Sequence, residues 1–258
     1  MSWQPERYLA FDDYRTRPAA DLLARVPLRA PERVVDLGCG PGNSTALLAL
    51  RWPQADVVGI DSAAAMLAKA REGGIAARWV EADIASWTPE VPVDLLFSNA
   101  ALQWLPDHQT LLPRLLGHLR PGGVLAIQMP RNFQAASHVT LREVAAEKPW
   151  AARLAGVLRA EPVASPASYH DLLAPLAASL EIWQTEYLQV LEGEDPVLRW
   201  TEATALRPVL QTLDEIEGAA FKQAYAARLR ETYPRRPDGT TLFPFLRLFI
   251  VAQRAQRP

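Results

Sequence analysis

Val34-Val35-Asp36-Leu37-Gly38-Cys39-Gly40-Pro41-Gly42-Asn43 is the stretch of this sequence that decides the fold. Its β-branched start predicts a buried strand, and the β-branched run stops at an acid, Asp36. Three glycines then follow at every second position, namely Gly38, Gly40 and Gly42. Because glycine lets a backbone approach a neighbour closely, we expect this loop to lie against another group.

An apolar helix is predicted directly after the glycines, over residues 46–50. The N–H groups of its first turn would lie unpaired beside the loop. A second apolar run, residues 57–60, ends at another acid, Asp61. The order of strand, glycine loop, helix, strand and acid predicts a nucleoside-binding βαβ unit.

The spacing of the glycines discriminates between nucleoside cofactors. A dinucleotide fingerprint would place its third glycine at position 43, where this chain has Asn43. Asp36 would repel a pyrophosphate but suits a cationic amino group, and the two oxygens of Asp61 suit a ribose diol. S-adenosylmethionine has both groups and no phosphate, so we favour it over a nicotinamide cofactor. An ordinary strand–turn–helix without a ligand remains the structural alternative.

Later segments repeat the pattern of an apolar run that ends in a polar residue. Residues 78–84 contain Asp83, residues 94–99 end at Asn99, and a turn over residues 119–123 leads into a strand over 124–128. Together these motifs resemble the class I S-adenosylmethionine-dependent methyltransferases. The resemblance implies an α/β, Rossmann-like, doubly wound, seven-stranded and mostly parallel sheet, with an antiparallel last strand and helical insertions.

The same resemblance implies which residues bind the cofactor S-adenosyl-L-methionine. Asp83 and Ile84 would meet the adenine, and Asn99 and Ala100 would lie near the methionyl part. A helix cap or turn role is the alternative for Asp83, and a turn role for Asn99. The predicted cofactor residues are Arg17, Asp36, Gly38, Gly40, Gly42, Asn43, Asp61, Ser62, Met66, Asp83, Ile84, Asn99 and Ala100.

A narrower resemblance extends nearly from end to end of the chain. It is carried by residues 8–11, 15–19, 22–27, 102–108, 128–130, 206–208 and 246–252. These blocks are similar to the trans-aconitate 2-methyltransferases, which implies an O-methyltransferase that forms a monomethyl ester of a small polycarboxylate. The chain departs from that pattern at Arg131, where an acid is expected, and at Ala205, where glycine is expected.

A carboxylate acceptor makes a general base unnecessary, because carboxyl groups titrate near pH ~4 and are ionised at neutral pH. We therefore predict no catalytic acid or base, only residues that position the reactants. Arginines would bind the acceptor's other carboxylates, since a guanidinium matches a carboxylate in two-pronged geometry. Trp104 would line the site of methyl transfer. The predicted substrate residues are Arg15, Trp104, Arg131, Arg199, Trp200 and Arg207. Arg17 serves the methionyl carboxylate in this interpretation.

Composition narrows the class of protein. The 258 residues carry a net charge of −2, which disfavours a nucleic-acid partner. No apolar run is long enough for a membrane span, and the N-terminus lacks the apolar core of a signal peptide, so we expect a cytoplasmic protein. The single cysteine, Cys39, excludes an intrachain disulfide, and the four scattered histidines show no metal spacing. Oligomeric state stays open.

We expect one domain over residues 1–258. Residues 1–30 would form an N-terminal arm that covers the cofactor, and residues 31–130 would carry five strands of the cofactor-binding core. Residues 131–178 and 193–240 are predicted as helical acceptor-site or lid segments, separated by a strand over 180–190 and followed by a last strand over 246–252. Two alternatives remain: a class I methyltransferase with another small acceptor, and a module that binds S-adenosylmethionine without catalysis.

Overall fold

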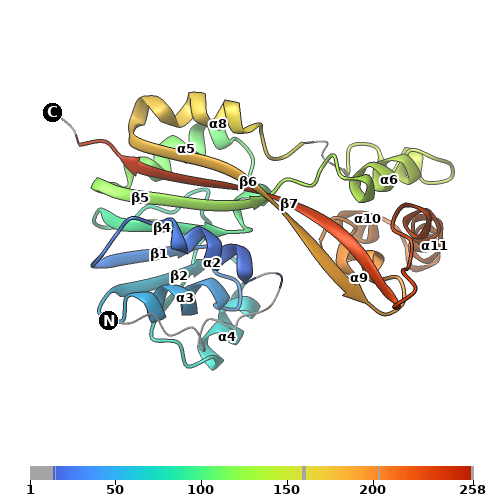
Figure 1. Ribbon diagram of the computed structural model, residues 1–258. Helices are drawn as coiled ribbons and strands as arrows, with labels where there is room; N and C mark the ends of the chain where they lie inside the picture. The colour runs from blue at the N-terminus through green and yellow to red at the C-terminus, as the bar shows by residue number, and fades with distance from the viewer. Residues whose placement is uncertain (1–13, 15, 159–160, 203, 257–258) are drawn as a thin grey trace. The chain divides into compact units, whose positions relative to one another are not determined.

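A seven-stranded sheet organises the computed structural model, which describes residues 14, 16–158, 161–202 and 204–256. The strands lie in the order β3-β2-β1-β4-β5-β7-β6 (Figure 1). Their bounds are β1 Arg33–Leu37, β2 Asp56–Asp61, β3 Arg78–Glu81, β4 Val93–Asn99, β5 Leu119–Pro130, β6 Ala177–Glu192 and β7 Thr240–Arg254. This arrangement confirms the predicted doubly wound fold.

The central strands are parallel and buried. β1 pairs in parallel with β2 and β4, and β4 pairs in parallel with β5. Residues 93–98 of β4 are all buried, as expected for a strand that is covered on both faces. The antiparallel strand β7 follows β5, with Gln128 opposite Phe249 and Pro130 opposite Arg247. The carboxyl ends of β1, β2, β4 and β5 therefore form one edge, where ligands bind in sheets of this kind.

The start of β5 differs from the prediction. Residues 119–123 were expected to form a turn, but the structure includes them in the strand. Val93 pairs with Leu119 and Leu95 pairs with Val124, so four residues of β5 oppose a single residue of β4. This bulge absorbs the glycine-containing segment without ending the strand.

Helices on both faces cover the sheet. α2 packs beside α3, and α5 packs beside α8, and Figure 1 shows these two pairs on opposite sides of the strands. The helices of this part of the chain are α2 Arg17–Ala24, α3 Asn43–Arg51, α4 Ala64–Glu72, α5 His108–Gly117 and α8 Pro166–Leu173, with short 3₁₀ turns η1 Leu102–Trp104 and η2 Ala174–Leu176.

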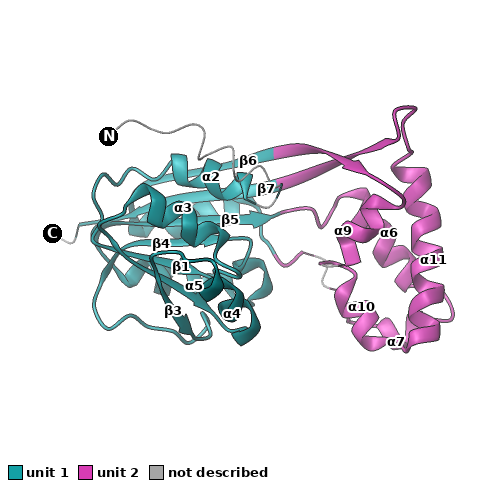
Figure 2. Ribbon diagram, turned by 90° about the horizontal axis from the view of Figure 1, so that it is seen from below, with its two compact units in different colours: residues 1–130, 163–185, 247–258 teal, residues 131–162, 186–246 magenta. Residues whose placement is uncertain are grey.

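Contacts divide the chain into two compact units, which Figure 2 colours separately. Unit 1 comprises residues 1–130, 163–185 and 247–258, and unit 2 comprises residues 131–162 and 186–246. Of the two predicted helical segments, residues 163–178 therefore belong to unit 1. Strands β6 and β7 each have residues in both units.

Unit 2 is helical and has a core of its own. Its helices are α6 Ala136–Ala145, α7 Ala151–Leu154, α9 Pro196–Glu202, α10 Arg207–Thr212 and α11 Glu215–Thr232. The fully buried rings of Phe221, Tyr225 and Phe243 lie at the centre of this core. The phenol of Tyr225 donates a hydrogen bond to the carbonyl oxygen of Ser137 (2.9 Å), which joins α11 to α6.

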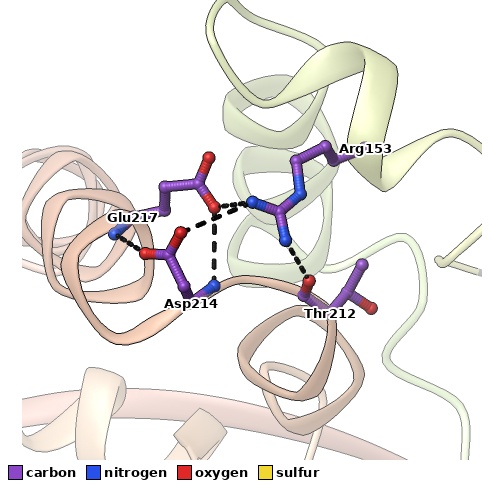
Figure 3. A network of polar contacts seen from close by, with 4 residues as sticks. All are labelled: Arg153, Thr212, Asp214 and Glu217. Carbon is purple, nitrogen blue, oxygen red and sulfur yellow. Dashed lines mark hydrogen bonds and ion pairs between the residues drawn. The ribbon is translucent and has the colours of Figure 1, made fainter.

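A polar network fixes the beginning of α11 (Figure 3). The side chain of Asp214 accepts a hydrogen bond from the backbone N–H of Glu217 (2.9 Å), and the Glu217 side chain accepts one from the N–H of Asp214, which makes a capping box. Arg153 of α7 pairs with Glu217 and donates to the carbonyl oxygen of Thr212 (2.8 Å). The network thus joins α7 to the α10–α11 turn.

We expect the cap, not the ion pair, to dominate the stability of this corner. Exposed ion pairs contribute little, whereas an N-cap satisfies helix N–H groups that otherwise lack partners. Asp214→Ala should therefore lower the melting temperature more than Arg153→Met does, in thermal denaturation followed by circular dichroism. An equal or larger loss in Arg153→Met would show that the ion pair is the more important contact.

Candidate functional site

The three glycines of the β1–α3 loop all adopt left-handed backbone conformations, with φ of 72° at Gly38, 54° at Gly40 and 94° at Gly42. They face different surroundings. A Cβ at Gly38 would overlap the Cβ of Ala101, and one at Gly42 would lie 2.9 Å from the ring of Trp79. At Gly40 a Cβ would meet no atom of the described residues within 4 Å. The close approach expected for the whole loop is thus an approach to protein at Gly38 and Gly42, whereas Gly40 faces space that none of the described residues fills.

Asp61, at the carboxyl end of β2, holds this loop. Its Oδ2 accepts a hydrogen bond from the backbone N–H of Gly40 (2.9 Å), and its Oδ1 accepts one from the N–H of Ala63 (2.8 Å). Each carboxylate oxygen has a second lone pair. Asp61 is half-buried, so it retains acceptor capacity beside Gly40.

Asp36, near the carboxyl end of β1, is fully buried. Its Oδ2 accepts hydrogen bonds from the hydroxyls of Ser44 and Thr45, both at 2.7 Å, in the first turn of α3. Its Oδ1 is buried and has no hydrogen-bond partner among the residues that the structure describes. Burial raises the pKa of Asp36 to about 6, because desolvation disfavours the carboxylate more than the two hydroxyls favour it.

The remaining predicted cofactor residues also belong to unit 1. Asp83 is exposed and its Oδ1 accepts a hydrogen bond from the N–H of Ala85 (2.8 Å), which is the turn geometry weighed as its alternative role, while Ile84 beside it is buried. Asn43 donates to the hydroxyl of Thr16 (3.4 Å) just before α2. Arg17, Ser62 and Met66 are exposed.

The turn after β4 carries two predicted cofactor residues and is held by buried side chains. Asn99 ends the strand, and Ala100 adopts a positive φ of 55°, which is strained for a residue other than glycine. The amide nitrogen of Gln103 donates to the carbonyl oxygen of Ala100 (2.6 Å). This hydrogen bond therefore stabilises the turn at Ala100, its strained residue.

The buried side chain of His108 makes a second contact that stabilises the segment after β4. Nε2 of His108 lies 2.9 Å from the carbonyl oxygen of Leu102, so this nitrogen must carry the proton. Nδ1 then accepts from the hydroxyl of Tyr169 (2.6 Å), and that oxygen accepts from the N–H of Ala164 (3.1 Å). With both ring nitrogens occupied, His108 has a structural role here.

The predicted substrate residues are divided between the two units. Trp104 belongs to unit 1 and is 59% exposed, and Arg15 lies outside the described residues. The unit 2 members are Arg131, Arg199, Trp200 and Arg207.

Within unit 2 these four residues have different surroundings. Arg199 donates to the carbonyl oxygen of Glu192 (3.1 Å), and Trp200 packs edge-on against Phe243 and Phe245. Arg207 is exposed at the first turn of α10, and Arg131 is half-buried. Their roles toward a substrate remain predictions.

Two buried polar residues that were not predicted lie at the same edge of the sheet. Gln128 in β5 is opposite Asn99 of β4, and Arg247 in β7 is 3% exposed. Nη1 of Arg247 donates to Oε1 of Gln128 (3.2 Å), and Nη2 donates to the carbonyl oxygen of Tyr14 (3.5 Å). The sequence did contain a signal for these two residues, because each is a polar residue within an apolar run. The runs are Ala126-Ile127-Gln128-Met129 and Leu246-Arg247-Leu248.

These residues have the chemistry that a cationic nucleoside would require. An open glycine next to a half-buried carboxylate can cradle a ribose, and the unpartnered Oδ1 of Asp36 is a buried acceptor for a cation. Among the described residues no group of three or more histidine, cysteine, aspartate or glutamate side chains has metal-binding geometry. Within the same residues, no helix has both the length and the apolar character needed to cross a membrane.

Comparison with known proteins agrees with this geometry. Residues 34–123 match the family model described as a methyltransferase domain. A trans-aconitate 2-methyltransferase of Azoarcus sp. is 56% identical over 98% of this chain and 99% of its own.

Solved structures share the fold at low sequence identity. The YcgJ protein of Bacillus subtilis is 12% identical, with a TM-score of 0.60 over 93% of this chain and 99% of its own. The Haemonchus contortus phosphoethanolamine N-methyltransferase 2, solved with S-adenosylhomocysteine, is 16% identical, with a TM-score of 0.56 over 93% of this chain and 53% of its own.

The raised pKa of Asp36 predicts a pH-dependent stability in the absence of ligand. Between its unfolded pKa of about 3.9 and its folded value of about 6, the folded state binds more protons than the unfolded state. The contribution of Asp36 is therefore fully present below about pH 4 and is lost as the pH rises through 6, by about 3 kcal/mol in all.

Asp36→Asn should remove this decrease in the free energy of unfolding with rising pH, while keeping an acceptor for the hydroxyls of Ser44 and Thr45. The measurement is urea denaturation of both proteins at several values between pH 4.5 and 7.5. The difference in free energy of unfolding, variant minus wild type, should grow as the pH rises. Parallel profiles would contradict the buried, desolvated carboxylate.

Substitutions at Gly38 and Gly40 should differ in how much they destabilise the fold. Gly38→Ala should destabilise the fold by about 2–4 kcal/mol, because it combines a left-handed φ with overlap at Ala101. Gly40→Ala serves as the matched control, since it has the strained φ without the overlap. Equal losses in chemical denaturation would show that the contact with Ala101 relaxes at no cost.

Proposed function

Because the chain belongs to the trans-aconitate 2-methyltransferase family, we propose that it transfers a methyl group from S-adenosyl-L-methionine to trans-aconitate or a similar small polycarboxylate, forming a monomethyl ester. The match of 56% over 98% of the chain supports the family's reaction for this protein. The structural observation that carries the proposal is the buried Oδ1 of Asp36, which has no hydrogen-bond partner among the described residues, together with Gly40, whose side of the loop is clear of the described atoms. A cationic, phosphate-free cofactor satisfies both features.

The chain's own residues hold the cofactor through opposite charge and close approach. The cofactor supplies an electrophilic methyl group on a sulfonium. Asp36 would accept a hydrogen bond from the cofactor's amino group, which would favour the ionised carboxylate and return the pKa of Asp36 toward its ordinary value. Asp61 would accept hydrogen bonds from the ribose hydroxyls with its remaining lone pairs, and Gly40 would leave space for the cofactor.

The reaction needs positioning of the acceptor, not proton transfer. A carboxylate acceptor is already ionised at neutral pH, so no base is required. The contacts of His108 are consistent with a reaction that uses no base, because both of its ring nitrogens are hydrogen-bonded within the fold. A second histidine, His138, has its pKa lowered to about 4 by burial, and it belongs to unit 2.

The arginines are proposed to bind the acceptor's other carboxylates. Arg207 is the best candidate, because it is exposed and its guanidinium makes no hydrogen bond or ion pair with the described residues. Arg199 is less available, since it donates to the carbonyl of Glu192. We also propose that the partner is a small organic acid and not a nucleic acid, and that the protein acts in the cytoplasm. The net charge of −2 supports the absence of a nucleic-acid partner.

A transfer assay with an acceptor panel tests the proposed reaction. Purified protein is mixed with methyl-labelled S-adenosylmethionine and, separately, trans-aconitate, cis-aconitate, citrate and a neutral alcohol of similar size. We expect labelled methyl ester from trans-aconitate above all others. Label transferred to the alcohol alone, or to none of them, would overturn the acceptor assignment.

Loss of the Asp61 carboxylate should weaken cofactor binding. Asp61→Ala is expected to raise the Kd of S-adenosylhomocysteine by about 5- to 150-fold, the range of about 1–3 kcal/mol for hydrogen bonds to a charged group. Isothermal titration calorimetry measures it.

Asp56→Ala is the matched control for this measurement. Asp56 lies at the opposite end of the same strand, where it pairs with Arg78 (2.6 Å). An unchanged Kd in Asp61→Ala would remove Asp61 from the ribose site.

A further inference from the structure

The orientation of the Gln128 amide follows from its neighbour. A guanidinium only donates hydrogen bonds, so the atom of Gln128 that faces Nη1 of Arg247 at 3.2 Å must be the oxygen. The amide nitrogen therefore points away from Arg247. Gln128 is 0% exposed, and its Nε2 has no hydrogen-bond partner among the described residues. A buried donor left without an acceptor destabilises the fold, because it has lost its hydrogen bonds to water and gained none in the protein.

The place of this donor in the sheet links it to ligand binding. Gln128 is the register partner of Asn99 in β4 and of Phe249 in β7. Residues paired in register point to the same face of a sheet. Gln128 and Asn99 thus lie side by side near the carboxyl ends of their strands, at the edge where ligands bind in this fold.

The chemistry of the unsatisfied group selects its ligand. An N–H donor needs an acceptor, and the Arg247 guanidinium beside Gln128 adds positive charge. Together they favour an anionic oxygen over a neutral one. Asp36 shows the opposite preference, since its unpartnered buried atom is an acceptor.

We propose that Gln128 is a specificity-determining residue whose Nε2 donates a hydrogen bond to a carboxylate oxygen of the bound acceptor, with Arg247 holding the amide in this orientation. The inference rests on the proposed function, because it takes the acceptor to be a polycarboxylate. Gln128 binds one of the carboxylates that is not methylated, since a donor on the attacking oxygen would weaken it as a nucleophile.

Two substitutions test this role. Gln128→Met keeps the length of the side chain and removes the donor. Gln128→Glu keeps an oxygen for Arg247 and replaces the donor by an acceptor. The matched control is Gln253→Met, which alters a glutamine at the other end of the β5–β7 pair, where it is opposite Val124 and donates to the carbonyl of Gly122 (2.9 Å).

The affinity for trans-aconitate is measured by calorimetry on protein saturated with S-adenosylhomocysteine, and KM and kcat are measured by methyl transfer. We expect Gln128→Met to raise Kd and KM for trans-aconitate about 10- to 100-fold, and Gln128→Glu to raise them further. The Kd of S-adenosylhomocysteine should stay within twofold in both variants. Gln253→Met should bind both ligands as the wild type does.

The outcomes separate the two proposals. Unchanged acceptor affinity in both Gln128 variants, with normal cofactor binding, would overturn the role of Gln128 and leave the proposed function standing. A weakened Kd for S-adenosylhomocysteine would assign the amide to the methionyl carboxylate and also overturn it. Wild-type protein that binds trans-aconitate without methylating it would refute the proposed function, while the affinities of the variants would still decide the role of Gln128.

Discussion

The buried carboxylate of Asp36 is the constraint on which the rest of the site depends. Removing a carboxylate from water is costly unless it finds compensating partners. Ser44 and Thr45 compensate one oxygen and thereby join the end of β1 to the first turn of α3. The other oxygen has no hydrogen-bond partner in the part of the chain that the structure describes. The chain thus accepts a local loss of stability at neutral pH, which a bound cation would recover.

Gln128 repeats this arrangement with the opposite polarity. It too is fully buried, and one of its two polar atoms is held by a neighbour while the other has no partner within the described chain. The unsatisfied atom is an acceptor on β1 and a donor on β5. A positively charged methyl donor and a negatively charged acceptor need these two preferences, and both lie near the carboxyl ends of parallel strands. In the two proposals made above, these two atoms are the ones that bind the positively charged cofactor and the negatively charged acceptor.

The loop between these elements shows how one sequence pattern serves several physical purposes. Gly38 and Gly42 have no Cβ because Ala101 and Trp79 occupy the space. Gly40 has no Cβ although none of the described atoms would contact one there, and its N–H donates a hydrogen bond to Asp61. The first two positions are matters of packing, and only the third bears on ligand approach. An identical residue at three regular positions gives no hint of this division.

The sequence by itself determined the βαβ unit and the acids Asp36 and Asp61 that end its strands, because these depend on local periodicity, turn chemistry and spacing along the chain. The fold class as a whole followed from the resemblance of its motifs to a known family. Only the tertiary structure decided which glycine faces open space, that the chain forms two units, and that residues 119–123 continue a strand. The same holds for Gln128 and Arg247, which are 119 positions apart in the chain and meet only because β5 pairs with β7. The physical reason is that burial and hydrogen-bond satisfaction are set by neighbours distant in sequence, and no local pattern records which neighbours those are.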